Sequence, residues 1–478
     1  MNQALAPQSV DTQTDSVSVR PVTFSPRRHG WLQDMGDAMQ RHRSVIQVIQ
    51  WTVVVVYFAL VIIPAFLPLP PDSAHIYDNL TRLAQFAFWG VWWPFVMVSM
   101  MLMGRVWCGV FCPEGSLTEL VSRRGLQYPI PRWIRWGGWP FVAFVMTTVF
   151  GQLLSVYEYP KATLLILGGS SLMALAVGYV YGRGARVWCR YLCPANGVFG
   201  LLARLAPLHF HVDRTAWKSK PAGTPAVACA TLIDIPRMTG ASACHACGRC
   251  SGHRDAVRLA ARSPSAEVLR LSPGAVSRWE VILLLFGVLG VALGAFQWSA
   301  SPWFVALKQS IATWLVAHDS YALLADNAPW WLLTHYPEAN DVFTWLDGLM
   351  VLFYIGTVAL VTGGWILASL WVAEKWLGRP GECWRLAYAL IPLAGTGAFL
   401  GLSMLTVTLL RAEGLALAWV SAARAALLIA ALIWSAWLAW RMLAKTGTTY
   451  RRRLLAFGTV LAGMALPAGM WFIQFFVW

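Results

Sequence analysis

The stretch Arg105-Val-Trp-Cys108-Gly-Val-Phe-Cys112-Pro113 follows an apolar run and returns 81 residues later as Arg186-Val-Trp-Cys189-Arg-Tyr-Leu-Cys193-Pro194. Cysteines four positions apart lie on one face of a helix. Proline suits the first turn of a new helix, because its missing N–H costs nothing there. We therefore predict that each copy ends a helix, presents two thiols on one face and starts a short amphipathic interfacial helix, over 114–124 and 195–204.

The composition is that of a membrane protein. Hydrophobic residues fill 58% of the 478 positions and charged residues only 12%, whereas soluble domains carry about 25% charged residues. The 28 tryptophans agree with this, because indole favours the boundary between lipid and water. Most of the chain is therefore expected to contact lipid.

Nine apolar runs are long enough for a hydrocarbon core, which about 20 helical residues cross. They cover 46–66, 84–103, 138–156, 162–181, 280–298, 348–372, 385–408, 415–440 and 455–477. The predicted fold class is an all-α polytopic membrane protein with about nine transmembrane helices and a small cytoplasmic insertion. The expected domains are an N-terminal tail (1–45), duplicated helix pairs (46–205), the insertion (206–279) and a C-terminal membrane region (280–478) with an outer loop (299–346).

Lysine and arginine collect in the loops 104–137, 182–279, 373–384 and 441–454, and the alternate loops contain few of them. Short basic loops stay in the cytoplasm, so the predicted N-terminus is inside and the C-terminus outside. All nine cysteines, including Cys383, are then cytoplasmic. The first 45 residues, with Arg27, Arg28, Arg41 and Arg43, look like a retained tail rather than a signal peptide. The net charge of +15 then indicates topology and contact with anionic lipid, not nucleic-acid binding.

A third cysteine group, Cys244-x-x-Cys247-x-x-Cys250, follows the second copy of the repeat. Reducing cytoplasm favours metal ligation by thiols over structural disulfides. This spacing places three thiolates around a [4Fe-4S] cluster in the bacterial pattern C-x2-C-x2-C-x3-C-P. The usual fourth cysteine is missing, because Arg254 and Asp255 occupy its place.

Cys229, upstream in the same loop, is the predicted fourth ligand of this cluster. His245 and His253 are alternatives for that position. A structural zinc ion bound by the same four cysteines is the competing interpretation, since zinc also uses C-x2-C spacers.

The paired cysteines Cys108, Cys112, Cys189 and Cys193 form a second candidate metal site. If the two helix pairs face each other, the four thiols could hold another cluster, bind copper or a different soft metal, or act as dithiols. They could also only fill the helix junction as small apolar side chains.

These motifs together resemble the membrane polyferredoxin family, which includes the iron–sulfur membrane subunit of periplasmic nitrate reductase, the nitrous-oxide-reductase maturation protein and the cytochrome-oxidase accessory protein. The match covers roughly residues 45–275. The resemblance implies a bacterial inner-membrane protein that moves electrons between the quinone pool or a cytoplasmic donor and a periplasmic acceptor, using [4Fe-4S] clusters at the cytoplasmic face. It also implies a ferredoxin-like insertion and an electron-transfer component rather than a stand-alone enzyme.

The chain departs from this family in three ways. It has one ferredoxin-like cysteine group where relatives often have two, it lacks the C-P ending, and it adds about 200 residues of membrane helices. The stretch Cys247-Gly-Arg-Cys250-Ser-Gly-His-Arg-Asp-Ala, with the Trp-rich tail, looks most like the polyferredoxin of bacterial ferrous-iron uptake systems. That resemblance implies a role in iron transport, with an iron permease or cupredoxin-type proteins as redox partners.

The outer loop 299–346 offers a further candidate metal site. Its metal-binding side chains are His318, Asp319, Asp326, His335, Glu338 and Asp341; they are also typical of an ordinary interfacial loop. None of the nine histidines falls inside a predicted span, so a haem b within the bilayer is not expected.

Two classes of function therefore compete. The first is a membrane electron-transfer protein with one or two [4Fe-4S] clusters, which we favour. The second is a metal-handling membrane assembly protein, in which the thiol pairs transfer copper or iron and zinc stabilises the cytoplasmic segment.

Overall fold

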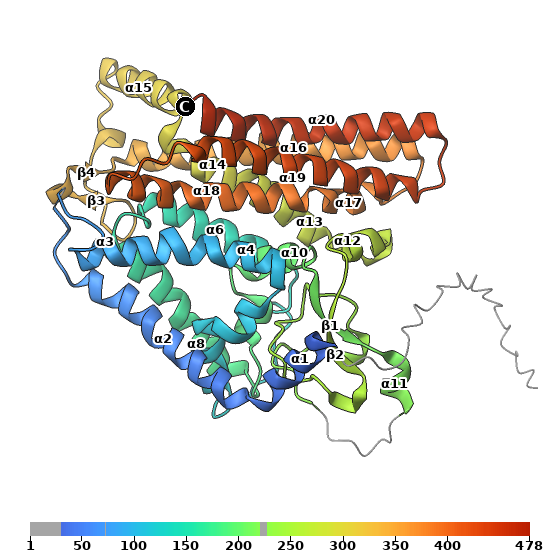
Figure 1. Cartoon of the computed structure of the whole chain (residues 1–478). Coiled ribbons are helices and arrows are strands. Elements are labelled where there is room, and N and C mark those ends of the chain that lie inside the picture. Colours follow the sequence, from blue (N-terminus) through green and yellow to red (C-terminus); the bar gives the residue numbers. More distant parts are fainter. Residues whose placement is uncertain (1–29, 72, 220–226) are drawn as a thin grey trace, which may run out of the picture.

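Helices that run side by side make up most of the chain in the computed structural model, which describes residues 30–71, 73–219 and 227–478 (Figure 1). Within these residues, eight helices are long and apolar enough to cross a membrane. Their bounds are Arg43–Ala65, Leu80–Met103, Pro160–Tyr181, Arg278–Ala300, Trp345–Leu377, Glu382–Ala412, Trp419–Ala444 and Tyr450–Phe476. The chain is thus a multi-pass membrane protein.

These eight helices match eight of the nine predicted runs. The remaining predicted run, 138–156, forms helix α6 (Trp139–Leu153) of 15 residues. This is shorter than the roughly 20 residues that span a hydrocarbon core, so the count of nine spans stays a prediction.

The duplication in sequence is repeated in structure. The first copy comprises α2 (Arg43–Ala65), α3 (Leu80–Gln85), α4 (Trp93–Met103) and α5 (Pro113–Ser122). The second comprises α6, α7 (Pro160–Thr163), α8 (Gly169–Tyr181), α9 (Val187–Tyr191) and α10 (Asn196–Ala203). In both copies a π-helical stretch, Phe86–Trp92 or Leu164–Gly168, interrupts the second long helix.

The C-terminal region supplies the helices at the top of Figure 1. They are α13 (Arg278–Ile282), α14 (Ala292–Gln297), α15 (Pro302–Ala317), α16 (Trp345–Leu377), α17 (Glu382–Ala387), α18 (Ile391–Ala412), α19 (Trp419–Ala444) and α20 (Tyr450–Phe476). The span Arg278–Ala300 is 72% buried, against 22% for Arg43–Ala65, so it is the central helix. Small residues bring helices close, as where Gly290 contacts Ala359.

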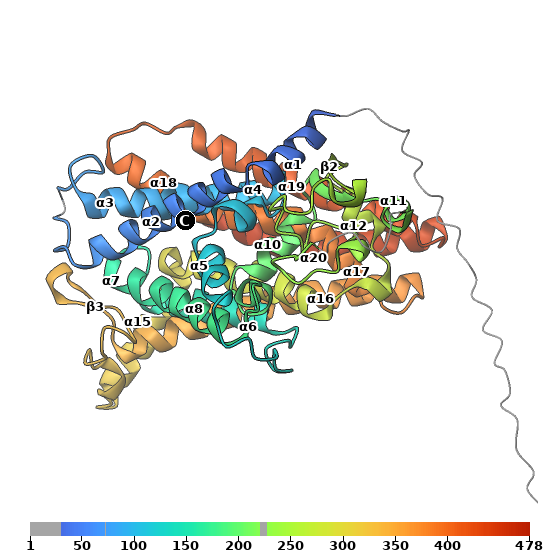
Figure 2. The same cartoon turned by 90° about the horizontal axis from the view of Figure 1, so that it is seen from below.

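A small unit lies at one end of the bundle (Figures 1 and 2). It contains the antiparallel strands β1 (Leu208–Val212) and β2 (Val257–Ala261), in register at Phe210 and Leu259, with α11 (Arg214–Ser219) and α12 (Ala266–Arg270). We call this end of the bundle, where α4 and α8 finish, the cysteine end. Whether the unit is ferredoxin-like stays a prediction.

Part of the predicted N-terminal tail belongs to this unit. Residues Trp31–Arg41 form helix α1, and Gly36 of α1 packs against Ser251 and Leu259. Leu32 and Met39 join the same apolar cluster as Phe210. Arg27 and Arg28 lie outside the described residues, and Arg43 is the first residue of α2.

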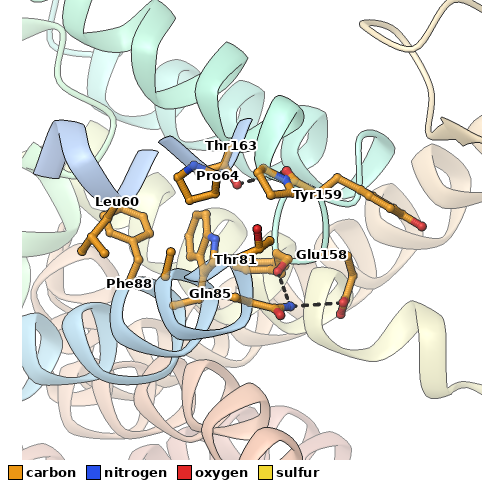
Figure 3. Close-up of a pocket in the computed structure, with 12 residues that line it drawn as sticks. Leu60, Pro64, Thr81, Gln85, Phe88, Glu158, Tyr159 and Thr163 are labelled. Atoms are coloured by element: carbon orange, nitrogen blue, oxygen red, sulfur yellow. Dashed lines mark hydrogen bonds between the residues drawn. The ribbon is translucent and has the colours of Figure 1, made fainter. Parts of the chain in front are cut away.

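The opposite end of the bundle carries α15 and the two-residue strands β3 (His335–Tyr336) and β4 (Asp341–Val342) (Figure 1). Figure 3 shows a small pocket at this end, where the two copies meet. The Gln85 amide donates to the Tyr157 backbone oxygen at 2.8 Å and to Glu158 at 3.2 Å. These contacts join α3 to the start of α7, far from the cysteine end.

Candidate metal centres

The two copies of the repeat end their helices with the same unusual turn. The backbone N–H of Cys112 donates to the Trp107 oxygen at 2.9 Å, and that of Cys193 donates to the Trp188 oxygen at 3.0 Å. Both bonds span five residues, as in a π-helix. The expected presentation of two thiols on one α-helical face is therefore wrong, because the helix stops between the cysteines and widens the turn. The helices after the prolines form as predicted, as α5 and α10.

The structure brings the two thiol pairs together. Burial, and then the nearby Cys108 and Glu114, raise the pKa of Cys112 to about 12. The pKa of Cys189 lies well above its ordinary value because of burial and then of Cys112 and Cys193. Four thiols from segments 81 residues apart thus share one buried site at the cysteine end.

The helix α5 is buried protein structure rather than an interfacial helix in lipid. Gly178 of α8 and Gly182, which caps its C-terminus, allow Thr118 and Ser122 of α5 to pack directly against them. Within this contact, Glu114 accepts hydrogen bonds from Ser170 at 2.6 Å and from the Trp188 indole at 2.9 Å. Sequence reasoning missed Glu114, although a carboxylate among the small residues of α5 was a usable signal.

The third cysteine group forms a separate site beside the two-stranded sheet. Cys229, Cys244, Cys247 and Cys250 line one pocket together with the apolar side chains of Phe210, Ile235 and Met238. Burial raises the pKa of Cys244 to about 12, with contributions from Cys247 and Cys229. The loop turns around this pocket at Gly248 and Gly252, which both have positive φ, a conformation that glycine adopts freely.

The alternative fourth ligands lie in different places. His245 lines the pocket with the four thiols and is buried. His253 packs against the Trp217 ring, with 5.2 Å between ring centroids, and Arg254 lies over the same ring at 5.3 Å. Cys229 remains the predicted ligand.

The two thiol sites touch each other through the backbone. A Cβ atom at Gly109 would lie 2.9 Å from the Cys247 nitrogen and would overlap the His245 oxygen. The side-chain amide of Gln50 in α2 donates a hydrogen bond to the Gly109 oxygen at 2.9 Å and so holds the Gly109 backbone in place. The π-helical turn Trp107–Phe111 therefore packs directly on the loop between Cys244 and Cys247.

In the described part of the chain, no group of three or more His, Cys, Asp or Glu side chains is arranged to hold a single metal ion. In the outer loop, Asp341 accepts a hydrogen bond from Tyr159 at 2.8 Å, and His318 Nδ1 is 2.8 Å from the Trp314 oxygen. Cys383, the ninth free cysteine, is buried in α17. Both four-thiol sets consist of soft sulfur donors, which suit an iron–sulfur cluster.

Comparison with known proteins identifies a 4Fe-4S binding domain in two segments, 85–136 and 164–213. These segments contain all four paired cysteines and end before Cys229. No solved structure matches the chain.

Three curated bacterial proteins show the relationship. YccM of Escherichia coli K12, whose name provisionally describes it as an electron transport protein, is 24% identical over 238 residues, or 43% of this chain and 65% of YccM. The regulatory protein NosR of Pseudomonas aeruginosa is 29% identical over 33% of this chain and 25% of that protein. NosR of Stutzerimonas stutzeri is 25% identical over 33% of this chain and 24% of that protein.

The chain thus spans just under two thirds of YccM and about a quarter of the NosR proteins. The resemblance inferred from the cysteine motifs is confirmed by the domain match and by these relatives. Over these segments the chain thus carries a 4Fe-4S binding domain and is similar to one protein named for electron transport and to two regulatory proteins.

Proposed function

We propose that the protein passes single electrons between a donor on the quinone or cytoplasmic side and a membrane or periplasmic partner. The adjacency of two four-thiol sets, in a chain with a twofold 4Fe-4S domain match, carries this proposal. Cys229, Cys244, Cys247 and Cys250 would hold one [4Fe-4S] cluster. Cys108, Cys112, Cys189 and Cys193 would hold a second. Such clusters supply one-electron chemistry when bound.

An apolar pocket inside the bundle supports a lipid-soluble donor. Its volume is about 160 Å³, and it extends to Pro194, the residue after Cys193. A cavity of about 150 Å³ accommodates a benzene-sized ring. Polar groups on its wall include Thr147, Thr148, Tyr157 and the indole N–H of Trp93, which has no hydrogen-bond partner among the described residues.

A quinol fits this wall, because it combines an apolar ring with oxygen atoms that accept a hydrogen bond. Its oxidation releases two electrons and two protons, which matches two one-electron sites next to each other. Most of the residues that line the pocket are apolar, so the protein would hold the ring mainly by apolar contact.

The remaining parts of the proposal are location and pathway. Basic loops support placement in a bacterial inner membrane with the cysteine end in the cytoplasm. The resemblance around Cys247 and Cys250 supports a role as the redox accessory of a ferrous-iron uptake system, with an iron permease or cupredoxin-type protein as acceptor. Deletion of the chain is then expected to lower uptake of ferrous iron by intact cells.

The first experiment is anaerobic purification of the full chain, with iron and acid-labile sulfide measured per protein and EPR recorded after reduction with dithionite. Two clusters require about eight iron and eight sulfide per chain. Zinc without sulfide would overturn the proposal in favour of the metal-handling alternative.

The quinol pocket has its own test. Thr148→Phe fills the pocket and is expected to slow cluster reduction by a soluble quinol while dithionite still reduces the clusters. Met146→Phe, on the outer face of the same helix α6 and 65% exposed, is the matched control and should behave as the wild type. Equal quinol reduction in both variants would remove the pocket from the pathway.

A further inference from the structure

The arginine that starts each copy of the repeat lies between the two thiol sites. Arg186 is 1% exposed. Its Nη1 donates to the Cys108 backbone oxygen at 2.6 Å, and its Nε donates to Glu119 at 2.9 Å. Its backbone N–H donates to the oxygen of Ala230, the neighbour of Cys229, at 2.6 Å. One residue therefore contacts the paired site, α5 and the loop site.

Arg105 occupies the corresponding place from the first copy. It is 4% exposed. Its guanidinium donates to the Asn196 side chain at 2.7 Å and to the Ser242 oxygen at 2.9 Å, and Nη2 lies 3.8 Å from the Cys108 sulfur. Each arginine thus reaches across to the helix that follows the other thiol pair, since Asn196 begins α10 and Glu119 belongs to α5.

Both charges act on both sites. The thiols close enough to affect Arg186 include Cys189 and Cys112 of the paired site and Cys247 of the loop site. Arg105 acts in the same way on Cys244.

The charge balance around the two arginines is incomplete without an anion. Glu119 faces Arg186 and also pairs with Arg249, 2.6 Å away, and with Arg123, 3.0 Å away. Within the described residues, the hydrogen bonds of the Arg105 guanidinium go to a carbonyl oxygen, an amide oxygen and a thiol, and its Nε has none. A buried charge without a counter-charge is strongly destabilising. Deprotonated thiolates around a cluster would supply that counter-charge.

We propose that Arg105 and Arg186 are positioning residues that hold the two cluster sites at a fixed separation and raise the reduction potential of both. The inference rests on the proposed function. A cluster bound by four thiolates gains one negative charge when it accepts an electron, so nearby buried positive charge favours the reduced form. Glu119, which offsets Arg186, opposes this effect.

The test is an EPR-monitored redox titration of the full-length protein, with iron and sulfide counted in every variant. Arg105→Gln and Arg186→Gln are expected to shift the midpoint potentials of both clusters to more negative values. Glu119→Gln is expected to shift them to more positive values. Arg186→Lys, which keeps the charge, should restore most of the wild-type potential.

Arg123→Gln is the matched control, because Arg123 pairs with the same carboxylate but is 56% exposed; its potentials should equal those of the wild type. Shifts of the same sign in the arginine and glutamate variants, or no shift at full iron content, would overturn the inference. If Arg105→Gln or Arg186→Gln loses its clusters, the shift in Glu119→Gln still decides the sign.

The wild type separates this inference from the proposed function. Absence of iron and sulfide would refute the electron-transfer role itself. About four iron atoms per chain instead of about eight would mean that only one cluster is bound. The electron-transfer role would then stand, but the inference that Arg105 and Arg186 act on two clusters would be refuted.

Discussion

The paired site and the loop site hold the same number of thiols in different ways. The paired site is built from two short helices that follow long ones, Trp107–Phe111 and Val187–Tyr191, with Cys108 and Cys189 both buried and a common π-type turn in each copy. The loop site is built from a loop that a two-stranded sheet and α1 support. The 4Fe-4S domain match covers the first site and ends before the second. This difference indicates that the duplicated unit of the chain is the membrane helices with the paired site. The loop site lies outside that duplicated unit.

The largest expected effect is the loss of the cluster from one site when a single cysteine of that site is replaced by serine. Cys229→Ser should remove the EPR signal of the loop-site cluster and about half of the iron, while Arg254→Ala should remove neither, because Arg254 packs on Trp217. Cys189→Ser should remove the other half. An intact signal in Cys229→Ser would point to His245 as the ligand, and loss of all iron in either serine variant would show that the sites depend on each other.

A substitution at the contact between the sites should affect both. Gly109→Ala places a methyl group against the backbone of His245 and Cys247, and overpacking of this kind costs about 3 kcal/mol. Iron occupancy should fall at both sites. Gly169→Ala, where no heavy atom lies within 4 Å of the added Cβ, is the control and should keep full occupancy.

Acid should open the loop site before the paired site. Burial, and then Arg262 and His211, lower the pKa of His209 in β1 to about 4, against about 6.5 in an unfolded chain. The unfolded form therefore binds the proton first, so stability is complete above pH 6.5 and is lost as the pH falls toward 4, by about 2 kcal/mol.

Hydrogen exchange of the β1 amides as a function of pH measures this loss. His209→Gln should weaken the dependence of the β1 protection factors between pH 6.5 and 4, with His211 keeping part of it because its pKa is also lowered by burial. The amides of α5 should not show the dependence. Equal protection factors of wild-type β1 at both pH values would contradict the assignment to His209.

The smallest expected effect is a difference in thermal stability between equivalent tryptophan variants in the two copies of the repeat. Trp188→Phe removes an indole donor from the buried Glu114 carboxyl, which costs about 1 kcal/mol. Trp107, its counterpart, packs on Trp92 with ring centroids 5.1 Å apart, and Trp107→Phe keeps an aromatic ring there. Thermal unfolding should show a lower midpoint for Trp188→Phe than for Trp107→Phe.

Much of this architecture follows from local features of the chain. Eight spans, the helices after Pro113 and Pro194, and the resemblance to 4Fe-4S proteins were predictable, because hydropathy, proline position and cysteine spacing act over a few residues. Helix α1 was missed, although Leu32 and Met39 mark the apolar face that packs near Phe210.

By itself, the sequence determined a duplicated membrane protein with eight thiols in two recognisable patterns. Only the tertiary structure decided that the four paired cysteines share one site, that Gly109 lies on the Cys247 loop and that Arg105 and Arg186 cross between the copies. Those contacts join segments up to about 140 residues apart, as from Arg105 to Ser242. Such contacts depend on how helices pack, which spacing along the chain does not encode.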